Sequence, residues 1–176
     1  MKKIIVILGQ TATGKSSLAV KIAKKMGGEI ISADSRQVYT GLDIGTGKIT
    51  KKEMKGVPHH LLDIANPKRK FSVALYKKLA ENKIKEIIAR GKIPIICGGT
   101  GFYIDAITKG VIFPEVPPNA KLRKELTTKS AIALFKVLKK LDTDRAKNID
   151  PNNKIRLIRA IEIAKTLGKV PKITET

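Results

Sequence analysis

The sequence has few of the residues that stabilise secreted proteins or that span membranes. Its 176 residues include a single cysteine, Cys97, so a framework of disulfides is excluded. No apolar run approaches the length of a membrane-spanning helix. The apolar N-terminal stretch is interrupted by Gly9–Lys15, and no cleavage site for a signal peptide follows it. We therefore expect a cytoplasmic protein.

Acidic residues are also scarce. The chain has 15 aspartates and glutamates against 36 lysines and arginines, which gives a formal net charge of +21. Such a charge favours a polyanionic partner, because clustered cations release counterions when they meet phosphates. The lysines are spread along the chain, however, which fits a lysine-rich surface without a partner equally well. The hydrophobic fraction of 42% excludes a disordered chain.

The most informative motif lies at the N-terminus. A strand predicted at Ile4–Leu8 runs directly into the pattern Gly-x4-Gly-Lys-Ser, and a helix is predicted at Ser16–Met26. In this pattern the backbone N–H groups and Lys15 bind a diphosphate, while the Ser16 hydroxyl ligates a Mg²⁺ that bridges phosphate oxygens. The free N–H groups of the helix add to the anion binding. The predicted diphosphate-binding residues are Gly9, Gln10, Thr11, Ala12, Thr13, Gly14, Lys15 and Ser16.

Strands and helices alternate through the first two thirds of the chain. Further strands are predicted at Glu29–Ser32, Leu61–Ile64 and Ile93–Cys97. Helices are predicted at Phe71–Arg90 and, after a tight loop at Gly98–Gly101, up to about Thr108. This order predicts an α/β fold, a P-loop NTPase-like parallel sheet with helices on both faces. Ligands bind such sheets at the carboxyl ends of the strands. The loops after the first, second and last strands are therefore expected to share one crevice.

The last third has a different character. Prolines mark a linker near residue 115, and short basic helices are predicted at Lys121–Leu126 and Ser130–Leu141. A longer helix is predicted at Ile155–Leu167. We expect a P-loop α/β core over residues 1–118, a small helical insert over 119–150, and a helix returning to the core over 151–176.

A carboxylate is missing where many nucleotide-hydrolysing P-loop enzymes have one. The strand Ile93–Cys97 ends in two glycines and Thr100, and Asp63 is a weak substitute. The acid expected in the crevice is instead Asp34, one residue after Ala33. The residues that follow it, Ser35, Arg36 and Gln37, have side chains able to read base edges. The alternative roles are structural: Asp34 caps its own loop, and Thr100 caps the helix after it.

Six segments in the same order resemble the tRNA dimethylallyltransferase (tRNA isopentenyltransferase) family: Gly9–Ser16, Ser32–Tyr39, Leu42–Lys48, Pro58–Asp63, Gly98–Tyr103 and Arg156–Glu162. The resemblance implies an enzyme that transfers a dimethylallyl group from dimethylallyl diphosphate to the N6 amine of the adenine 3′-adjacent to the tRNA anticodon. It also implies Mg²⁺ as the cofactor and tRNA as the partner, and we expect a monomer. Members of that family continue beyond the position of Thr176.

The residues agree with this chemistry. The diphosphate is the leaving group, and the phosphate loop stabilises the charge that develops on it. Asp34 is the expected general base for the amine proton, and Thr100 is expected to hold the reacting ends in place. The target adenine must leave the base stack of the anticodon loop to reach the crevice. We expect Ser35, Arg36 and Gln37 to recognise it by side-chain hydrogen bonds.

The resemblance places further tRNA contacts in the last third of the chain, at Arg123, Ile155, Arg156, Leu157, Ile158 and Arg159. The i, i+3 spacing of Arg156 and Arg159 also fits a solvated helix face. His59 and His60 lack further ligands at metal spacing and are expected to be structural.

Two other functions stay open. A small nucleotide kinase has the same strand, loop and helix, but it should also show an arginine-rich lid, and none is present. A non-catalytic tRNA-binding fragment fits the positive charge, but it needs neither Lys15 nor Asp34.

Overall fold

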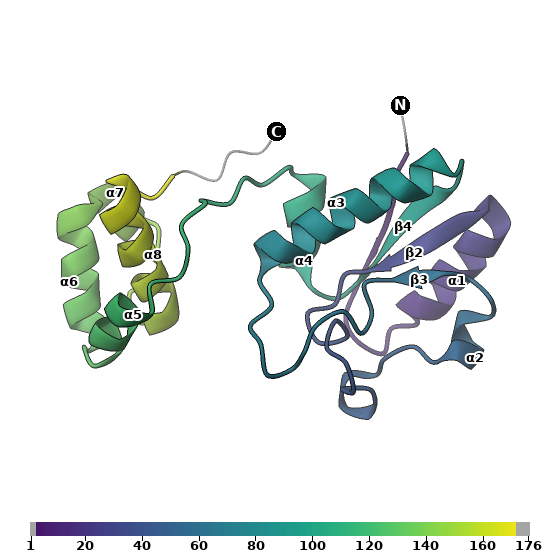
Figure 1. Ribbon diagram of the computed structural model, residues 1–176, viewed down its shortest axis with the longest axis horizontal. Helices are drawn as coiled ribbons and strands as arrows, with labels where there is room; N and C mark the ends of the chain where they lie inside the picture. Colours follow the sequence, from purple (N-terminus) through teal and green to yellow (C-terminus); the bar gives the residue numbers. More distant parts are fainter. Residues whose placement is uncertain (1–2, 172–176) are drawn as a thin grey trace. The chain divides into compact units, whose positions relative to one another are not determined.

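The computed structural model describes residues 3–171 and divides them into two compact units. The first, the α/β unit, contains the described residues up to Val111, and the second, the helical unit, begins at Ile112 (Figure 1). No helix in the described part of the chain is long and apolar enough to cross a membrane.

The α/β unit is built on a sheet of four parallel strands. They are β1 (Ile5–Leu8), β2 (Gly28–Ser32), β3 (His59–His60) and β4 (Ile93–Gly98), in the spatial order β1-β4-β2-β3. Since β4 lies between β1 and β2, the carboxyl ends of these three strands meet at one edge. The predicted α/β fold with a parallel sheet is confirmed.

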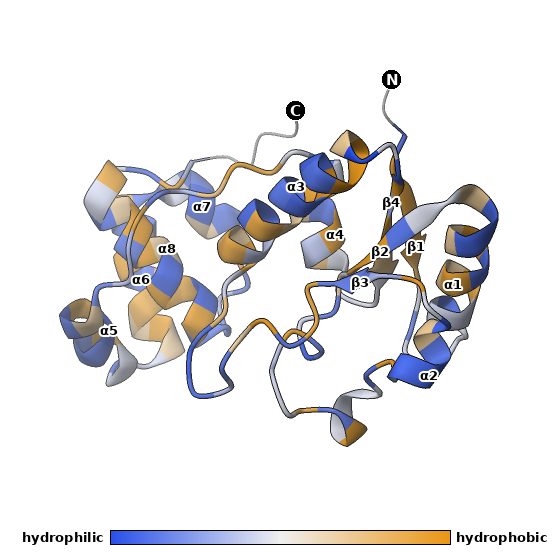
Figure 2. Cartoon of the chain, turned by 45° about the vertical axis from the view of Figure 1, so that its right-hand side comes forward, coloured by the Kyte–Doolittle hydropathy of each residue, from blue (hydrophilic) through white to orange (hydrophobic). Residues whose placement is uncertain are grey.

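Helices cover both faces of this sheet. On one face α1 (Lys15–Met26) packs against alternate strand residues that include Ile30 and Ile95. On the other face α3 (Val73–Ala89) and α4 (Gly101–Thr108) pack against a set that includes Ile31 and Ile96. Consecutive strand residues face opposite sides, so the apolar run of each inner strand serves both cores. Figure 2 shows β4 as hydrophobic, whereas β2, which contains Glu29, also has a hydrophilic stretch.

Strand β1 forms one edge of the sheet. Within residues 3–171 its outer side has no strand neighbour. Ile4, Val6 and Leu8 are 40%, 39% and 58% exposed, and Val6 pairs in register with the buried Ile96. These three side chains therefore extend the α3 and α4 face of the sheet into an exposed apolar strip.

The connection between β2 and α3 contains short elements that the sequence did not predict, η1 (Ile44–Thr46) and α2 (Lys51–Met54). The strand predicted at Leu61–Ile64 was wrong, because β3 occupies His59–His60 instead. Leu61 and Asp63 have φ values of +62° and +56°. These left-handed conformations cannot continue an extended strand.

The helical unit consists of α5 (Ala120–Thr127), α6 (Ala131–Leu141), α7 (Thr143–Lys147) and α8 (Lys154–Leu167). Its core contains fully buried apolar residues from three of these helices, among them Leu126, Leu134, Leu138, Leu157 and Ile161.

The domain boundaries expected from the sequence differ from this division. The structure separates the units after Val111, ahead of the prolines, and it groups α8 with α5, α6 and α7. The apolar face of α8 is covered by α6 and α5. That face is thus used inside the helical unit.

Candidate active site

The phosphate loop lies between β1 and α1. Gly14 and Ala12 have left-handed φ values of +80° and +66°, and Gly14 is the residue immediately before α1. The Thr13 hydroxyl donates to the Gln10 carbonyl at 2.8 Å, and the Lys15 ammonium donates to the same oxygen. The loop is therefore curled around the Gln10 carbonyl, with Lys15 folded over it.

Asp34 follows β2 and makes an Asx turn. Its Oδ1 accepts hydrogen bonds from the N–H groups of Arg36 (2.8 Å) and Gln37 (3.4 Å). The expected capping alternative is thus realised by one oxygen of the carboxylate. Oδ2 makes none of the hydrogen bonds found in residues 3–171, so it is free to accept a proton.

Thr100 follows β4 and joins the two loops. Its Oγ1 accepts a hydrogen bond from the Ser35 N–H at 2.9 Å and donates to the Ser35 hydroxyl at 3.2 Å. Although Thr100 is the residue before α4, its side chain makes no capping hydrogen bond to that helix. The capping role that the sequence left open for Thr100 is therefore not observed.

The backbones of these two loops approach closely. The Ala33 N–H donates to the Cys97 carbonyl at 2.8 Å, and the Thr100 N–H donates to the Ala33 carbonyl at 3.1 Å. A Cβ atom on Gly98 would lie 2.1 Å from the Ala33 oxygen, so only glycine fits there. This contact fixes the distance between the Asp34 and Thr100 loops.

The three loops form one open pocket of about 540 Å³, a size typical of small-molecule sites. The shared crevice predicted from the strand order is thereby confirmed. The pocket is lined by residues of the phosphate loop, of the loops after β2 and β4, and of the segment that contains η1: Gln10, Thr11, Asp34, Ser35, Arg36, Gly45, Thr46, Gly47, Gly99 and Thr100.

The sequence did not identify one wall of this pocket. Gly45, Thr46 and Gly47 belong to Leu42–Lys48, a segment that entered the family resemblance but was given no role in the site. The amide nitrogen of Gln37 donates to the carbonyls of Thr46 (3.3 Å) and Gly47 (3.2 Å). Gln37, predicted to read a base, holds this wall with its amide nitrogen. The glycines of this segment and its place in the family resemblance were the available signals.

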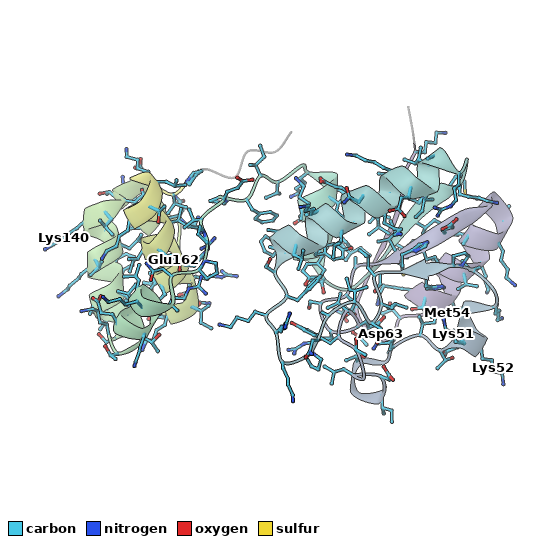
Figure 3. All side chains as sticks on the ribbon, in the orientation of Figure 1. Lys51, Lys52, Met54, Asp63, Lys140 and Glu162 are labelled. Atoms are coloured by element: carbon cyan, nitrogen blue, oxygen red, sulfur yellow. The ribbon has the colours of Figure 1, made fainter. Side chains whose placement is uncertain are left out.

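Asp63 is not placed as a metal ligand or water activator. Its carboxylate accepts a hydrogen bond from Lys48 Nζ at 2.5 Å (Asp63 is labelled in Figure 3). No group of three or more metal-ligating side chains occurs among the described residues. Within the phosphate loop the Ser16 hydroxyl, on an exposed residue at the start of α1, is the oxygen that the sequence predicted as a ligand for a divalent cation.

The two histidines have structural partners, as expected. His59 Nδ1 lies 2.8 Å from the Val57 carbonyl, and His60 Nε2 lies 2.7 Å from Glu29 Oε2. The same Glu29 oxygen accepts a hydrogen bond from Arg90 at 2.7 Å. Burial lowers the pKa of His59 and outweighs its bond to Val57.

The residues expected to contact tRNA in the last third lie in the helical unit, in different environments. Arg123 and Arg159 both pair with Glu162, whose side chain is 1% exposed (Figure 3). Burial alone would raise the pKa of Glu162, but hydrogen bonds from Arg123, the Asn119 N–H and Arg159 lower it to about 2. These two arginines therefore have a structural role in this unit.

The other four predicted residues are the neighbours of Arg159 on α8. The Leu157 side chain is fully buried in the helical core, so it is unavailable to an RNA. Ile158 is partly buried against the same core, whereas Ile155 is 82% exposed and Arg156 is also exposed. Of the predicted segment, Ile155 and Arg156 are thus the most accessible.

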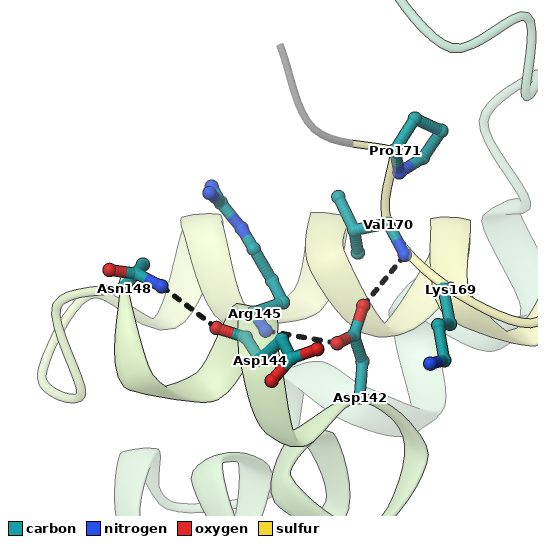
Figure 4. A pocket seen from close by; sticks show the side chains of 7 residues that line it. All are labelled: Asp142, Asp144, Arg145, Asn148, Lys169, Val170 and Pro171. Atoms are coloured by element: carbon teal, nitrogen blue, oxygen red, sulfur yellow. Dashed lines mark hydrogen bonds between the residues drawn. The ribbon is translucent and has the colours of Figure 1, made fainter.

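A second pocket lies within the helical unit and contains none of the predicted site residues (Figure 4). Asp142 dominates it: its Oδ1 accepts from the Arg145 N–H at 2.9 Å and its Oδ2 from the Val170 N–H at 2.7 Å. The buried carboxylate therefore starts α7 and holds the segment after α8. We assign this pocket a structural role.

Comparison with known proteins identifies the family. A model described as IPP transferase matches residues 37–176. The chain belongs to the IPP transferase family. The tRNA dimethylallyltransferase of Anoxybacillus flavithermus (strain DSM 21510 / WK1) is 48% identical over 168 residues, a match that covers 96% of this chain and 54% of that protein.

Solved structures agree with this family assignment. The full-length tRNA isopentenylpyrophosphate transferase from Bacillus halodurans matches with a TM-score of 0.65 at 44% identity, covering 96% of this chain and 57% of that one. A eukaryotic dimethylallyltransferase acting on tRNA matches with a TM-score of 0.83 at 32% identity, covering 100% of this chain and 46% of that one. The chain thus spans about half the length of the IPP transferases that it matches.

Proposed function

We propose that this chain takes part in the transfer of a dimethylallyl group from dimethylallyl diphosphate to the N6 amine of the adenine 3′-adjacent to a tRNA anticodon. One observation carries the proposal. Asp34, which keeps one carboxylate oxygen outside its turn, and Thr100 line the same pocket as Gln10 and Thr11 of the phosphate loop. The family membership of the chain supports the same reaction.

The phosphate loop binds the diphosphate of the donor. The positive end of α1 and the loop N–H groups attract the anion, and Lys15 exchanges its hydrogen bond to the Gln10 carbonyl for one to a phosphate oxygen. These groups stabilise the negative charge that develops on the leaving diphosphate as the allylic C–O bond breaks.

Ser16 is the residue that would hold a Mg²⁺ ion. A single hydroxyl fits this ion, because Mg²⁺ at phosphate sites takes its other ligands from the phosphates and from water. When bound, the ion neutralises charge on the diphosphate.

Asp34 accepts the proton of the adenine amine as the new N–C bond forms. Oδ1 is held by the Arg36 and Gln37 N–H groups, so the carboxylate keeps its orientation while Oδ2 faces the substrate. General base catalysis of this kind increases the reaction rate about 10²–10⁴-fold. Thr100, fixed by Ser35, holds the reacting ends near this oxygen.

The decisive experiment offers the chain both kinds of donor. With Mg²⁺, labelled dimethylallyl diphosphate and an anticodon stem-loop bearing the target adenine, label should move to the RNA. ATP should not be hydrolysed, because Asp63, after β3, is bound to Lys48, and the residues directly after β4, Gly99 and Thr100, carry no carboxylate. Binding of ATP alone decides nothing, since the loop holds any diphosphate.

Two results would contradict the proposal. Transfer of the ATP phosphate to a small acceptor would favour the alternative that the chain is a small nucleotide kinase. Binding of the RNA without affinity for either diphosphate would favour a tRNA-binding fragment. A stem-loop with guanine at the target position is the matched control.

A further inference from the structure

Lys48 follows the pocket residue Gly47 in the sequence, and the proposed reaction gives Lys48 no role. Its side chain is 5% exposed, and its ammonium donates to three acceptors: Asp43 Oδ1 (2.7 Å), Asp63 Oδ1 (2.5 Å) and the Tyr39 carbonyl (2.8 Å). These acceptors come from three separate points of the connection between β2 and α3. One buried cation therefore joins the beginning, the middle and the end of this connection.

The charge of Lys48 is maintained in this position. Burial alone would lower its pKa, but the hydrogen bonds to Asp43 and Asp63 outweigh burial and raise it. An ammonium has three N–H donors, and here each has an acceptor. A buried, fully bonded cation of this kind fixes its partners far better than an exposed ion pair does.

The segment that Lys48 holds is the unpredicted pocket wall. The Lys48 N–H donates to the Asp43 carbonyl at 3.1 Å, which closes a loop over residues 43–48. Gln37 holds the same loop from the pocket side through the Thr46 and Gly47 carbonyls. Ile44, at the tip of this loop, is fully exposed.

We propose that Lys48 is a positioning residue for the RNA substrate: it fixes residues 43–47 as the wall against which the target nucleotide is placed beside Asp34. This inference rests on the proposed function. The wall shares its pocket with Arg36 and Asp34, on the side expected to read the base. Gln10 and Thr11 of the phosphate loop also line that pocket, whereas Lys15 and Ser16 do not. Gly47 also lies beside Ser16 in a neighbouring pocket. The proximity of the wall to Arg36 and Asp34 is the ground for assigning it to the acceptor RNA.

The test compares Lys48→Met, which keeps the length of the side chain and removes its charge, with Lys48→Arg. We expect Lys48→Met to weaken binding of the anticodon stem-loop at least tenfold, while binding of Mg²⁺-pyrophosphate changes less than twofold. In transfer assays the KM for RNA should rise and the KM for dimethylallyl diphosphate should not. Lys48→Arg should recover part of the RNA affinity. Lys52→Met, on the exposed side of α2, is the matched control.

Hydrogen exchange of residues 43–48 is the second readout. Lys48→Met should remove the protection of the Gly47 and Lys48 amides, and unchanged protection would overturn the proposal. Lost protection with unchanged RNA affinity would also overturn it, because the wall would then have no part in RNA binding. If the unaltered chain binds no RNA, the proposed function fails and the role in RNA binding fails with it. Lost protection would in that case show that Lys48 still fixes the loop.

Discussion

The side chain of Thr100 and the backbone of Ser35 are linked by a hydrogen bond of 2.9 Å between residues 65 positions apart in the sequence. Because Asp34 precedes Ser35, this bond connects the free carboxylate oxygen to the end of β4. Asp34 and Thr100, whose side chains were predicted to act together, are thus linked through this one contact.

Replacing Lys15 with alanine should abolish binding of the diphosphate donor and leave most of the RNA affinity. The Lys15 ammonium donates to the Gln10 carbonyl of the phosphate loop, and Lys15 does not line the pocket that contains Asp34. Calorimetric titration with Mg²⁺-pyrophosphate and fluorescence titration with the stem-loop measure the two affinities. Lys25→Ala, in the last turn of α1, is the control. An equal loss of both affinities would argue against separate sites.

Replacing Asp34 with asparagine should slow transfer by two or more orders of magnitude while both substrates still bind. An asparagine Oδ1 can still accept from the Arg36 and Gln37 N–H groups, so the turn is preserved and the general base is removed. Single-turnover rates with saturating substrates measure the effect. Near-normal turnover would mean that the carboxylate is only a loop cap.

Replacing Gly98 with alanine should destabilise the α/β unit by several kcal/mol, because the new Cβ would overlap the Ala33 backbone. Urea unfolding followed by circular dichroism measures the loss. Gly101→Ala is the matched control, since a Cβ there meets nothing within 4 Å. Similar stability of the two variants would show that the loops can separate without cost.

Replacing Glu162 with glutamine should weaken the helical unit at neutral pH by about 3 kcal/mol, from a pKa lowered to about 2 and about 1.4 kcal/mol per pKa unit. A lowered pKa gives stability that is present above pH 4.5 and is lost as the pH falls toward 2. The difference from the unaltered chain should therefore vanish in acid. Exchange of the α8 amides at pH 7 and at the lowest attainable pH tests this, with Glu125→Gln on α5 as the control. A difference independent of pH would exclude the ion pairs as its cause.

Local signals in the sequence predicted most of the fold. Serine is a residue typical of helix starts, and the Ser72 hydroxyl accepts from the Leu75 N–H at the start of α3, close to the predicted beginning of this helix. The predictions that were wrong concern residues whose conformation depends on contacts with residues distant in the sequence. Asp63, one of the two left-handed residues, is bound by Thr40 and Lys48, and such distant partners are not visible in a local pattern.

In the candidate site, too, the parts that depend on local sequence were predicted and the parts that depend on distant contacts were not. The phosphate loop and the Asp34 turn depend on residues close in sequence, and both were predicted. The wall formed by residues 45–47 depends on Lys48 and Gln37 folding back over it, so composition suggested only a loop. In the helical unit, helical spacing could not distinguish an arginine facing solvent from one paired with the buried Glu162.

The open edge of β1 governs how the chain behaves in concentrated solution. Free backbone groups beside the apolar strip of Ile4, Val6 and Leu8 are a template for pairing between molecules. The net charge of +21 opposes that pairing by repulsion, and salt screens repulsion over a Debye length of about 8 Å at 0.15 M. Colloidal stability of the chain should therefore fall with ionic strength, and Val6→Lys should raise the salt concentration at which aggregation begins.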